Sequence, residues 1–187
     1  MSLGIAILIV ALSTAFYTLA IAQQSGLSSS LLERSTNVDV PVVLCIDDKP
    51  VAGGQPSSHA YAKAAANGYR SVLTLRTNKD GVDLTRERFM VEQSKLRYFN
   101  IPATDKLPRR EQVDEFLRMV RDKSNHPMLI NCAFAERVAP YMMIFRITEQ
   151  GWSETKAVEE ARQSGLRGDQ LKKFARDYLA SQKKKTM

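Results

Sequence analysis

The chain has 187 residues, a length typical of one domain, and its 27 Lys and Arg residues against 20 Asp and Glu residues give a net charge of +7. That charge favours anionic partners, but aromatic residues make up only 7% and do not interleave with a basic run, so no nucleic-acid partner is expected. Two cysteines and two histidines without ligand spacing argue against a structural zinc site.

The chain opens with an uncharged, mostly apolar segment, residues 3–22, that predicts a signal peptide or an N-terminal membrane anchor. Ala20 and Ala22 before Gln23 fit a small-x-small cleavage site, which favours a signal peptide over residues 1–22. A length of about twenty residues can span a bilayer, and no Lys or Arg precedes the run; both points favour the anchor. Either way, the rest of the chain is expected to be exported, as a periplasmic or secreted protein, with a membrane tether if residues 3–22 are retained.

Composition divides the remaining chain into three parts. Residues 23–37 are rich in Ser and Gln and predict a tether. Residues 38–182 predict a single domain, and residues 183–187 form a basic tail that solvation alone explains.

Within the domain, hydrophobic periodicity predicts alternating strands and helices. Strands are expected over residues 38–46, 71–76, 97–101 and 128–130, with a turn over residues 51–56. Helices are expected over residues 59–67, 83–96, 113–120 and 138–147, then from a cap at Ser153 to Gly165, and finally from a cap at Asp169. This alternation predicts a three-layer α/β sandwich, in which helices flank a mostly parallel central sheet of four to five strands.

Three residues from separate stretches lie at or just beyond the carboxyl end of a predicted strand: Arg76, Asp105 and Cys132. In parallel sheets, ligands bind beyond the carboxyl ends of the strands. The three residues are therefore expected at one edge of the sheet.

The segment from Cys132 to Arg137 is the strongest candidate site. A buried strand is predicted to end at Cys132, and a buried helix to begin just after Arg137. Loop N–H groups and a helix N-terminus attract anions and favour a thiolate, while an arginine fork binds two phosphate or sulfate oxygens. The alternative is that Cys132 is a small core residue and that Arg137 pairs with Glu136 or Glu149 at the surface.

The second cysteine, Cys45, lies in a predicted strand and is expected in the core. In an oxidising compartment a disulfide between Cys45 and Cys132 is conceivable. Such a bond would disable the nucleophile, so the free thiol is favoured.

Several short motifs recur in a familiar order: Gly54-Gln55-Pro56, the stretch from Gly68 to Arg76, Ile101-Pro102, Cys132-x4-Arg137-Val138, Arg146-Ile147 and Gly151-Trp152-Ser153 with Ala157 and Glu160. This series resembles the bacterial tyrosine-phosphatase-like proteins of the cysteine-dependent phosphatase superfamily. It is similar to the compact group related to dual-specificity phosphatases, which includes a domain fused to β-lactamase-like hydrolases. The resemblance covers roughly residues 42–165.

The resemblance implies hydrolysis of a phosphate monoester, on a protein or a small molecule, through a phosphocysteine at Cys132. Arg137 and the loop would bind the phosphate oxygens, and Asp105 would protonate the leaving oxygen and then activate water. No metal or organic cofactor is needed. The expected substrate-binding residues are Ala133, Phe134, Ala135, Glu136, Arg137, Val138 and Arg76.

The loop departs from the usual pattern of this superfamily, which is His-Cys-x5-Arg with a loop glycine and a Ser or Thr after the arginine. Here the loop is one residue shorter, Asn131 precedes the cysteine, Ala135 replaces the glycine and Val138 lacks a hydroxyl. Glu136 also adds a negative charge. A catalytically weak or silent binding module is therefore the second hypothesis, and a rhodanese-like sulfurtransferase, which also uses Cys-x4-Arg, is the third.

Overall fold

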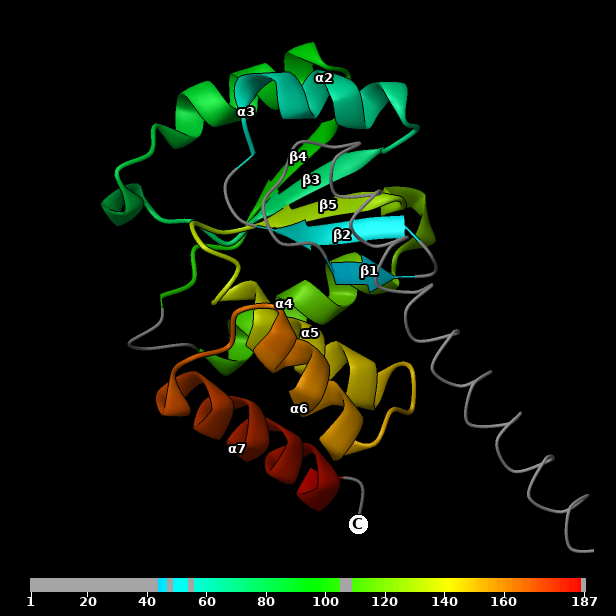
Figure 1. Ribbon diagram of the computed structural model, residues 1–187, viewed down its shortest axis with the longest axis vertical. Helices are drawn as coiled ribbons and strands as arrows, with labels where there is room; N and C mark the ends of the chain where they lie inside the picture. Colours follow the sequence, from blue (N-terminus) through cyan, green and yellow to red (C-terminus); the bar gives the residue numbers. More distant parts are fainter. Residues whose placement is uncertain (1–43, 47–48, 54–55, 105–108, 186–187) are drawn as a thin grey trace, which may run out of the picture.

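The computed structural model describes residues 44–46, 49–53, 56–104 and 109–185 (Figure 1). Five strands form one sheet in the order β1-β2-β5-β3-β4. Their bounds are β1 Leu44–Ile46, β2 Lys49–Gly53, β3 Ser71–Thr74, β4 Arg97–Asn100 and β5 Met128–Asn131. Only β1 runs antiparallel, to β2, and the other pairings are parallel. The prediction of a mostly parallel sheet of four to five strands is therefore confirmed.

The strand β2 corrects the sequence analysis, which expected a turn over residues 51–56. Ala52 pairs with Ile130 and Gly53 with Asn131, so this stretch is a strand beside β5. Backbone pairing with a central strand overrides the turn tendency of Gly53, because strand formation depends more on neighbours than on intrinsic preference. Of the strand expected over residues 38–46, the described residues are Leu44–Ile46, which form β1.

Helices cover both faces of the sheet, which confirms the three-layer sandwich (Figure 1). On one face lie α2 (Ser58–Ala66) and α3 (Leu84–Gln93). The other face carries α4 (Arg110–Arg121), α5 (Val138–Thr148), α6 (Glu154–Gln163) and α7 (Asp169–Lys185). The helix α7 includes residues 183–185, which the sequence analysis placed in a basic tail.

Each face of the sheet has its own core. Val72 and Leu129 face α2 and α3, whereas Leu73 and Ile130 face α4 and α5, as the alternation of side chains along a strand requires. On α4 the predicted apolar positions are all buried: Val113, Phe116, Leu117 and Val120. The N-terminal half of α5 is buried on every side, so the residue at its start is held by the core.

The predictions for residues 1–37 lie outside the described residues. Within the described ranges, every helix is too short or too polar to cross a bilayer.

Candidate active site

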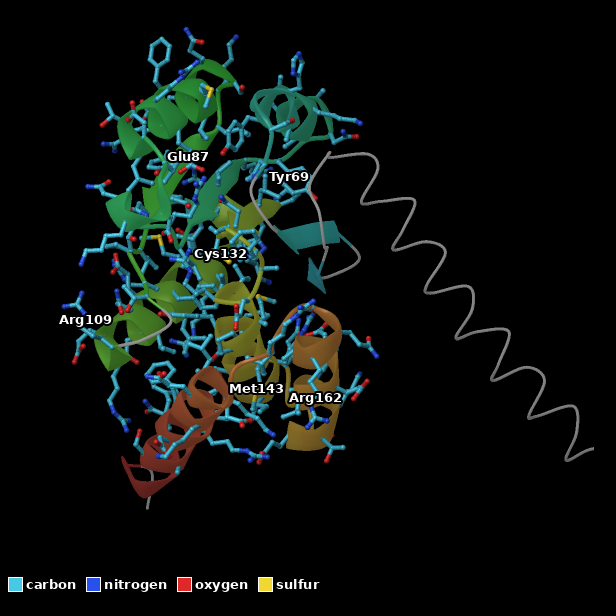
Figure 2. All side chains as sticks on the ribbon, turned by 60° about the vertical axis from the view of Figure 1, so that its left-hand side comes forward. Tyr69, Glu87, Arg109, Cys132, Met143 and Arg162 are labelled. Atoms are coloured by element: carbon cyan, nitrogen blue, oxygen red, sulfur yellow. The ribbon has the colours of Figure 1, made fainter. Side chains whose placement is uncertain are left out.

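The strand β5 delivers Cys132 to the carboxyl edge of the sheet. The residue follows Asn131 directly, is 1% exposed, and is a free thiol rather than part of a disulfide. Figure 2 labels Cys132 near the middle of the molecule, between the helix layer that carries Glu87 and the layer that carries Met143.

The loop from Cys132 to α5 leads directly into the N-terminus of that helix. Phe134 forms an isolated backbone bridge, and among the described residues the N–H groups of residues 133, 136 and 137 have no acceptor. The N–H groups of Val138 and Ala139 both donate to the Ala135 carbonyl oxygen at 3.1 Å, which closes the loop onto α5. Backbone amides at a helix N-terminus can bind phosphate and sulfate.

Ala135 adopts the left-handed conformation, with φ of 64°. The sequence analysis identified this position as one where the related proteins have glycine. An L-residue with a Cβ pays roughly 1–2 kcal/mol for this conformation. The loop therefore adopts, at an alanine, a backbone conformation that favours glycine, and it carries a conformational strain there.

The connection between α6 and α7 supports the loop from outside. A Cβ placed on Gly165 would lie 3.5 Å from the Phe134 carbonyl oxygen, and Gly165 itself has φ of +109°. A Cβ on Gly168 would lie 3.6 Å from Oε1 of Glu136. The Glu136 carboxylate thus lies beside the N-terminus of α7, where the helix dipole stabilises negative charge.

The other loop side chains differ widely in exposure. Val138 is buried in the core with α5, Ala133 is half-buried, and Phe134 is 83% exposed. Their predicted roles in binding substrate remain predictions.

Arg137 is fixed by a carboxylate that the sequence analysis missed, Asp80. Nη1 donates to Asp80 Oδ2 at 2.9 Å and Nη2 donates to Asp80 Oδ1 at 2.8 Å. Nη1 also donates to the carbonyl oxygens of Ala103 at 2.8 Å and Leu75 at 3.3 Å. Arg137 therefore joins the chain segments that follow β3, β4 and β5. It does not pair with Glu136 or Glu149; Glu149 instead binds Arg121.

Asp80 lies in a short 3-10 helix, η1 (Asn78–Asp80), just beyond β3. Burial opposes its ionisation, but hydrogen bonds from Arg137 and from the Thr77 backbone outweigh burial and hold the pKa of Asp80 below its usual value. The available signal was an Asp-Gly pair in the turn after the strand that carries Arg76. Such pairs are common turn residues, so the pattern did not single Asp80 out.

Arg76 lies just beyond β3 and contacts α3, on the face of the sheet opposite α4 and α5. It is 2% exposed, and its Nη1 is 3.9 Å from Glu87 Oε1 on α3. Glu87 also accepts hydrogen bonds from Tyr61 at 2.8 Å and from Asn131, the residue before Cys132, at 3.4 Å. The structure thus places Arg76 in a buried network behind the Cys132 strand, and its role as a substrate ligand stays a prediction.

The predicted acid Asp105 lies outside the described residues. The chain just before it is held at the same edge: the Ala103 N–H donates to Leu75 at 3.2 Å, and the Ala103 carbonyl accepts from Arg137. Among the described residues, no group of three His, Cys, Asp or Glu side chains could hold a metal ion.

A buried cysteine after a parallel strand, followed by a short loop with an arginine at the start of a helix, is typical of the cysteine-dependent, tyrosine-phosphatase-like proteins. The family model described as "DSP-PTPase phosphatase fused to NAD+ Kinase" matches residues 47–177, and the chain belongs to this family. This membership confirms the resemblance drawn from the sequence and identifies the chain as a tyrosine or dual-specificity phosphatase-like protein. A comparison with curated proteins gave no significant match.

Solved structures share this fold at low sequence identity. A DUF442 phosphatase from Shewanella putrefaciens CN-32 aligns with a TM-score of 0.67 at 14% identity, covering 80% of this chain and 97% of its own. The catalytic domain of the PP-IP phosphatase SIW14 from S. cerevisiae, solved with citrate, gives 0.60 at 16% identity and covers 68% and 78%. TpbA from P. aeruginosa gives 0.58 at 18% identity and covers 73% and 89%; a cysteine-to-serine variant of TpbA was solved with phosphotyrosine.

Proposed function

We propose that this protein is an exported cysteine-dependent phosphatase that hydrolyses a phosphate monoester through a phosphocysteine intermediate. One observation carries the proposal: the free, buried Cys132 thiol is joined by a short loop to the N-terminus of α5, where Arg137 lies. Backbone N–H groups at a helix N-terminus are suited to stabilising the oxygens of a phosphoryl group during its transfer.

In the proposed first step, the Cys132 thiolate forms an Sγ–P bond as the ester P–O bond breaks. The loop amides and Arg137 stabilise the three equatorial oxygens, and Asp105 gives its proton to the leaving oxygen. In the second step, water forms a P–O bond as the Sγ–P bond breaks, and Asp105 takes a proton from the water. Inorganic phosphate leaves and the thiolate is restored.

The proposed substrates are phosphorylated proteins or small phosphate esters. Support comes from the structural relatives, among which are the PP-IP phosphatase SIW14 and a TpbA variant with bound phosphotyrosine. Residues 1–22 are proposed to export the domain, with a membrane tether if residues 3–22 are retained.

The direct test is hydrolysis of p-nitrophenyl phosphate by the full-length protein under reducing conditions, beside Cys132→Ser. We expect turnover that the variant loses completely, because serine at this position gives a far weaker nucleophile than a thiolate. Trapping a phosphorylated Cys132 after a rapid acid quench would support the covalent step. A Cys132→Ser protein as active as the wild type would rule out the covalent mechanism.

A second candidate function is a silent phosphate-binding module, and the strain at Ala135 is the observation that favours it. A folded wild-type protein that binds phosphate without hydrolysing any ester would support this alternative. Thiosulfate:cyanide sulfurtransfer by the same preparation would instead support the rhodanese-like hypothesis.

A further inference from the structure

We infer that Asp80 is a positioning residue, which holds Arg137 so that one edge of its guanidinium is presented to the anion bound by the Cys132 loop. The inference rests on the proposed function, because it assigns a role within the same phosphate site. It concerns a residue that none of the sequence motifs includes.

The donors of Arg137 divide into two sets. Nη1 donates to Asp80 and to the carbonyl oxygens of Ala103 and Leu75, and Nη2 uses one hydrogen on Asp80. Among the described residues, Nε and the second Nη2 hydrogen have no acceptor. In a planar guanidinium these two hydrogens lie on one edge and point the same way, so they form a free fork that matches two oxygens of a phosphate.

Asp80 is itself held in place before any ligand arrives. Its Oδ2 accepts from the Thr77 N–H at 2.6 Å and from the Thr77 hydroxyl at 3.1 Å. The 3-10 helix that carries it ends at Gly81 in the left-handed conformation, which suits glycine. Both partners are largely withdrawn from water, with side-chain exposures of 10% for Arg137 and 19% for Asp80. The pair is therefore preorganised rather than a loose surface contact.

A competing interpretation is that Asp80 occupies the place of the phosphate and blocks the site. That interpretation requires the ligand and Asp80 to use the same donors of Arg137. The geometry gives them different edges, because Asp80 accepts from Nη1 and Nη2 and not from Nε. The two interpretations predict opposite effects on phosphate affinity when the Asp80 charge is removed. Binding weakens if Asp80 positions Arg137, and it tightens if Asp80 blocks the site.

The test measures binding of inorganic phosphate by titration calorimetry with the full-length protein, which requires no turnover. Asp80→Asn keeps the size of the side chain and removes its charge. We expect the Kd for phosphate to rise roughly tenfold, as loss of one charge-assisted contact predicts. Asp80→Glu keeps the charge and should restore part of the affinity. Asp177→Asn, in an exposed pair with Lys173, is the matched control and should leave the Kd unchanged.

A double-mutant cycle separates positioning from a general structural effect. Arg137→Lys keeps the charge and loses the fork, so Asp80→Asn should have little further effect on phosphate binding in that background. Equal effects of Asp80→Asn in both backgrounds would reject the inference. Tighter phosphate binding by Asp80→Asn would identify Asp80 as a blocking group, and an unchanged Kd would deny it any role. A wild-type protein that binds no phosphate would reject the inference as well.

The outcome is separable from that of the proposed function. A protein that binds phosphate through the Asp80–Arg137 pair but hydrolyses no ester would overturn the proposed phosphatase activity and keep the positioning role. If the wild-type protein hydrolyses esters and Asp80→Asn binds phosphate as tightly as the wild type, the proposed phosphatase activity stands and the positioning role of Asp80 is rejected.

Discussion

Ala135 is the residue at which the Cys132 loop turns into α5. Its left-handed backbone directs its carbonyl oxygen to the N–H groups of Val138 and Ala139, so the same strained residue that shapes the loop also begins the helix. The side chain is 1% exposed, which leaves little room to relax the strain by moving the chain. Alanine is unfavourable at this position because of its backbone conformation, and not because its methyl group makes a poor contact.

Replacing Ala135 with glycine should therefore relieve strain, and Ala133→Gly in the same loop is the matched control. Both changes lower the free energy of unfolding by about 0.4–1 kcal/mol, because glycine raises the conformational entropy of the unfolded chain. Of these two alanines, Ala135 alone has a positive φ, so glycine recovers roughly 1–2 kcal/mol at Ala135 and not at Ala133. We expect Ala135→Gly to be more stable than Ala133→Gly by about that amount in urea unfolding. Equal stabilities would mean that the loop bears no strain at Ala135.

At the scale of elements, the loop is shaped by two neighbours that hold its two sides. The connection between α6 and α7 approaches the loop backbone at Gly165, and Arg137 ties the loop's far end to the segments after β3 and β4. The helix α6 is fixed in turn to α5, because Arg146 binds Glu160 through two hydrogen bonds of 2.9 and 2.8 Å. Movement of α6 should therefore reach the loop through Gly165.

Gly165→Ala tests this support, with Gly168→Ala as its control. Alanine at φ of +109° is strained by roughly 1–3 kcal/mol, and its Cβ would contact the Phe134 carbonyl. Gly168 has no such φ, and a Cβ there makes only ordinary contact with Glu136. We expect Gly165→Ala to lower the unfolding free energy by that amount and to weaken phosphate binding, with Gly168→Ala close to wild type. A weakened Gly168→Ala together with an intact Gly165→Ala would contradict the proposed support.

The sequence predicted those parts of this arrangement that depend on residues close together in the chain. The apolar spacing on α4 revealed its buried face, and the short strand before Cys132 placed the thiol at a sheet edge. Long-range partners were not readable in the same way. The strand β2 depends on pairing with β5, and Asp80 becomes significant only because folding places it against Arg137, 57 positions away. Arg76 follows a strand, and the sequence alone did not reveal its buried contact with Glu87.

At the scale of the whole molecule, one buried carboxylate joins both outer helices of one layer to the sheet. Glu87 on α3 accepts from Tyr61 on α2 at 2.8 Å, from Tyr98 on β4 at 3.3 Å and from Asn131 on β5 at 3.4 Å. Arg76 supplies the opposite charge at 3.9 Å. Burial and the charge of Glu87 raise the pKa of Tyr61, so its hydroxyl remains a donor over the whole physiological range. The network ends at Asn131, the residue before Cys132, so the α2 and α3 layer contributes to the position of Cys132.

Glu87→Gln should consequently destabilise the protein far more than a change to an exposed carboxylate on the same helix. Glutamine leaves the Arg76 charge buried without compensation, a change that costs about 3–5 kcal/mol in buried pairs. Glu92 pairs with Arg88 at 3.0 Å, but both side chains are more than half exposed, so Glu92→Gln should cost about 0–1 kcal/mol. Urea midpoints of the two variants, read beside the wild type, measure the difference. Similar midpoints for the two would mean that Arg76 finds another partner or water when Glu87 loses its charge, and that the network does not hold this layer to the sheet.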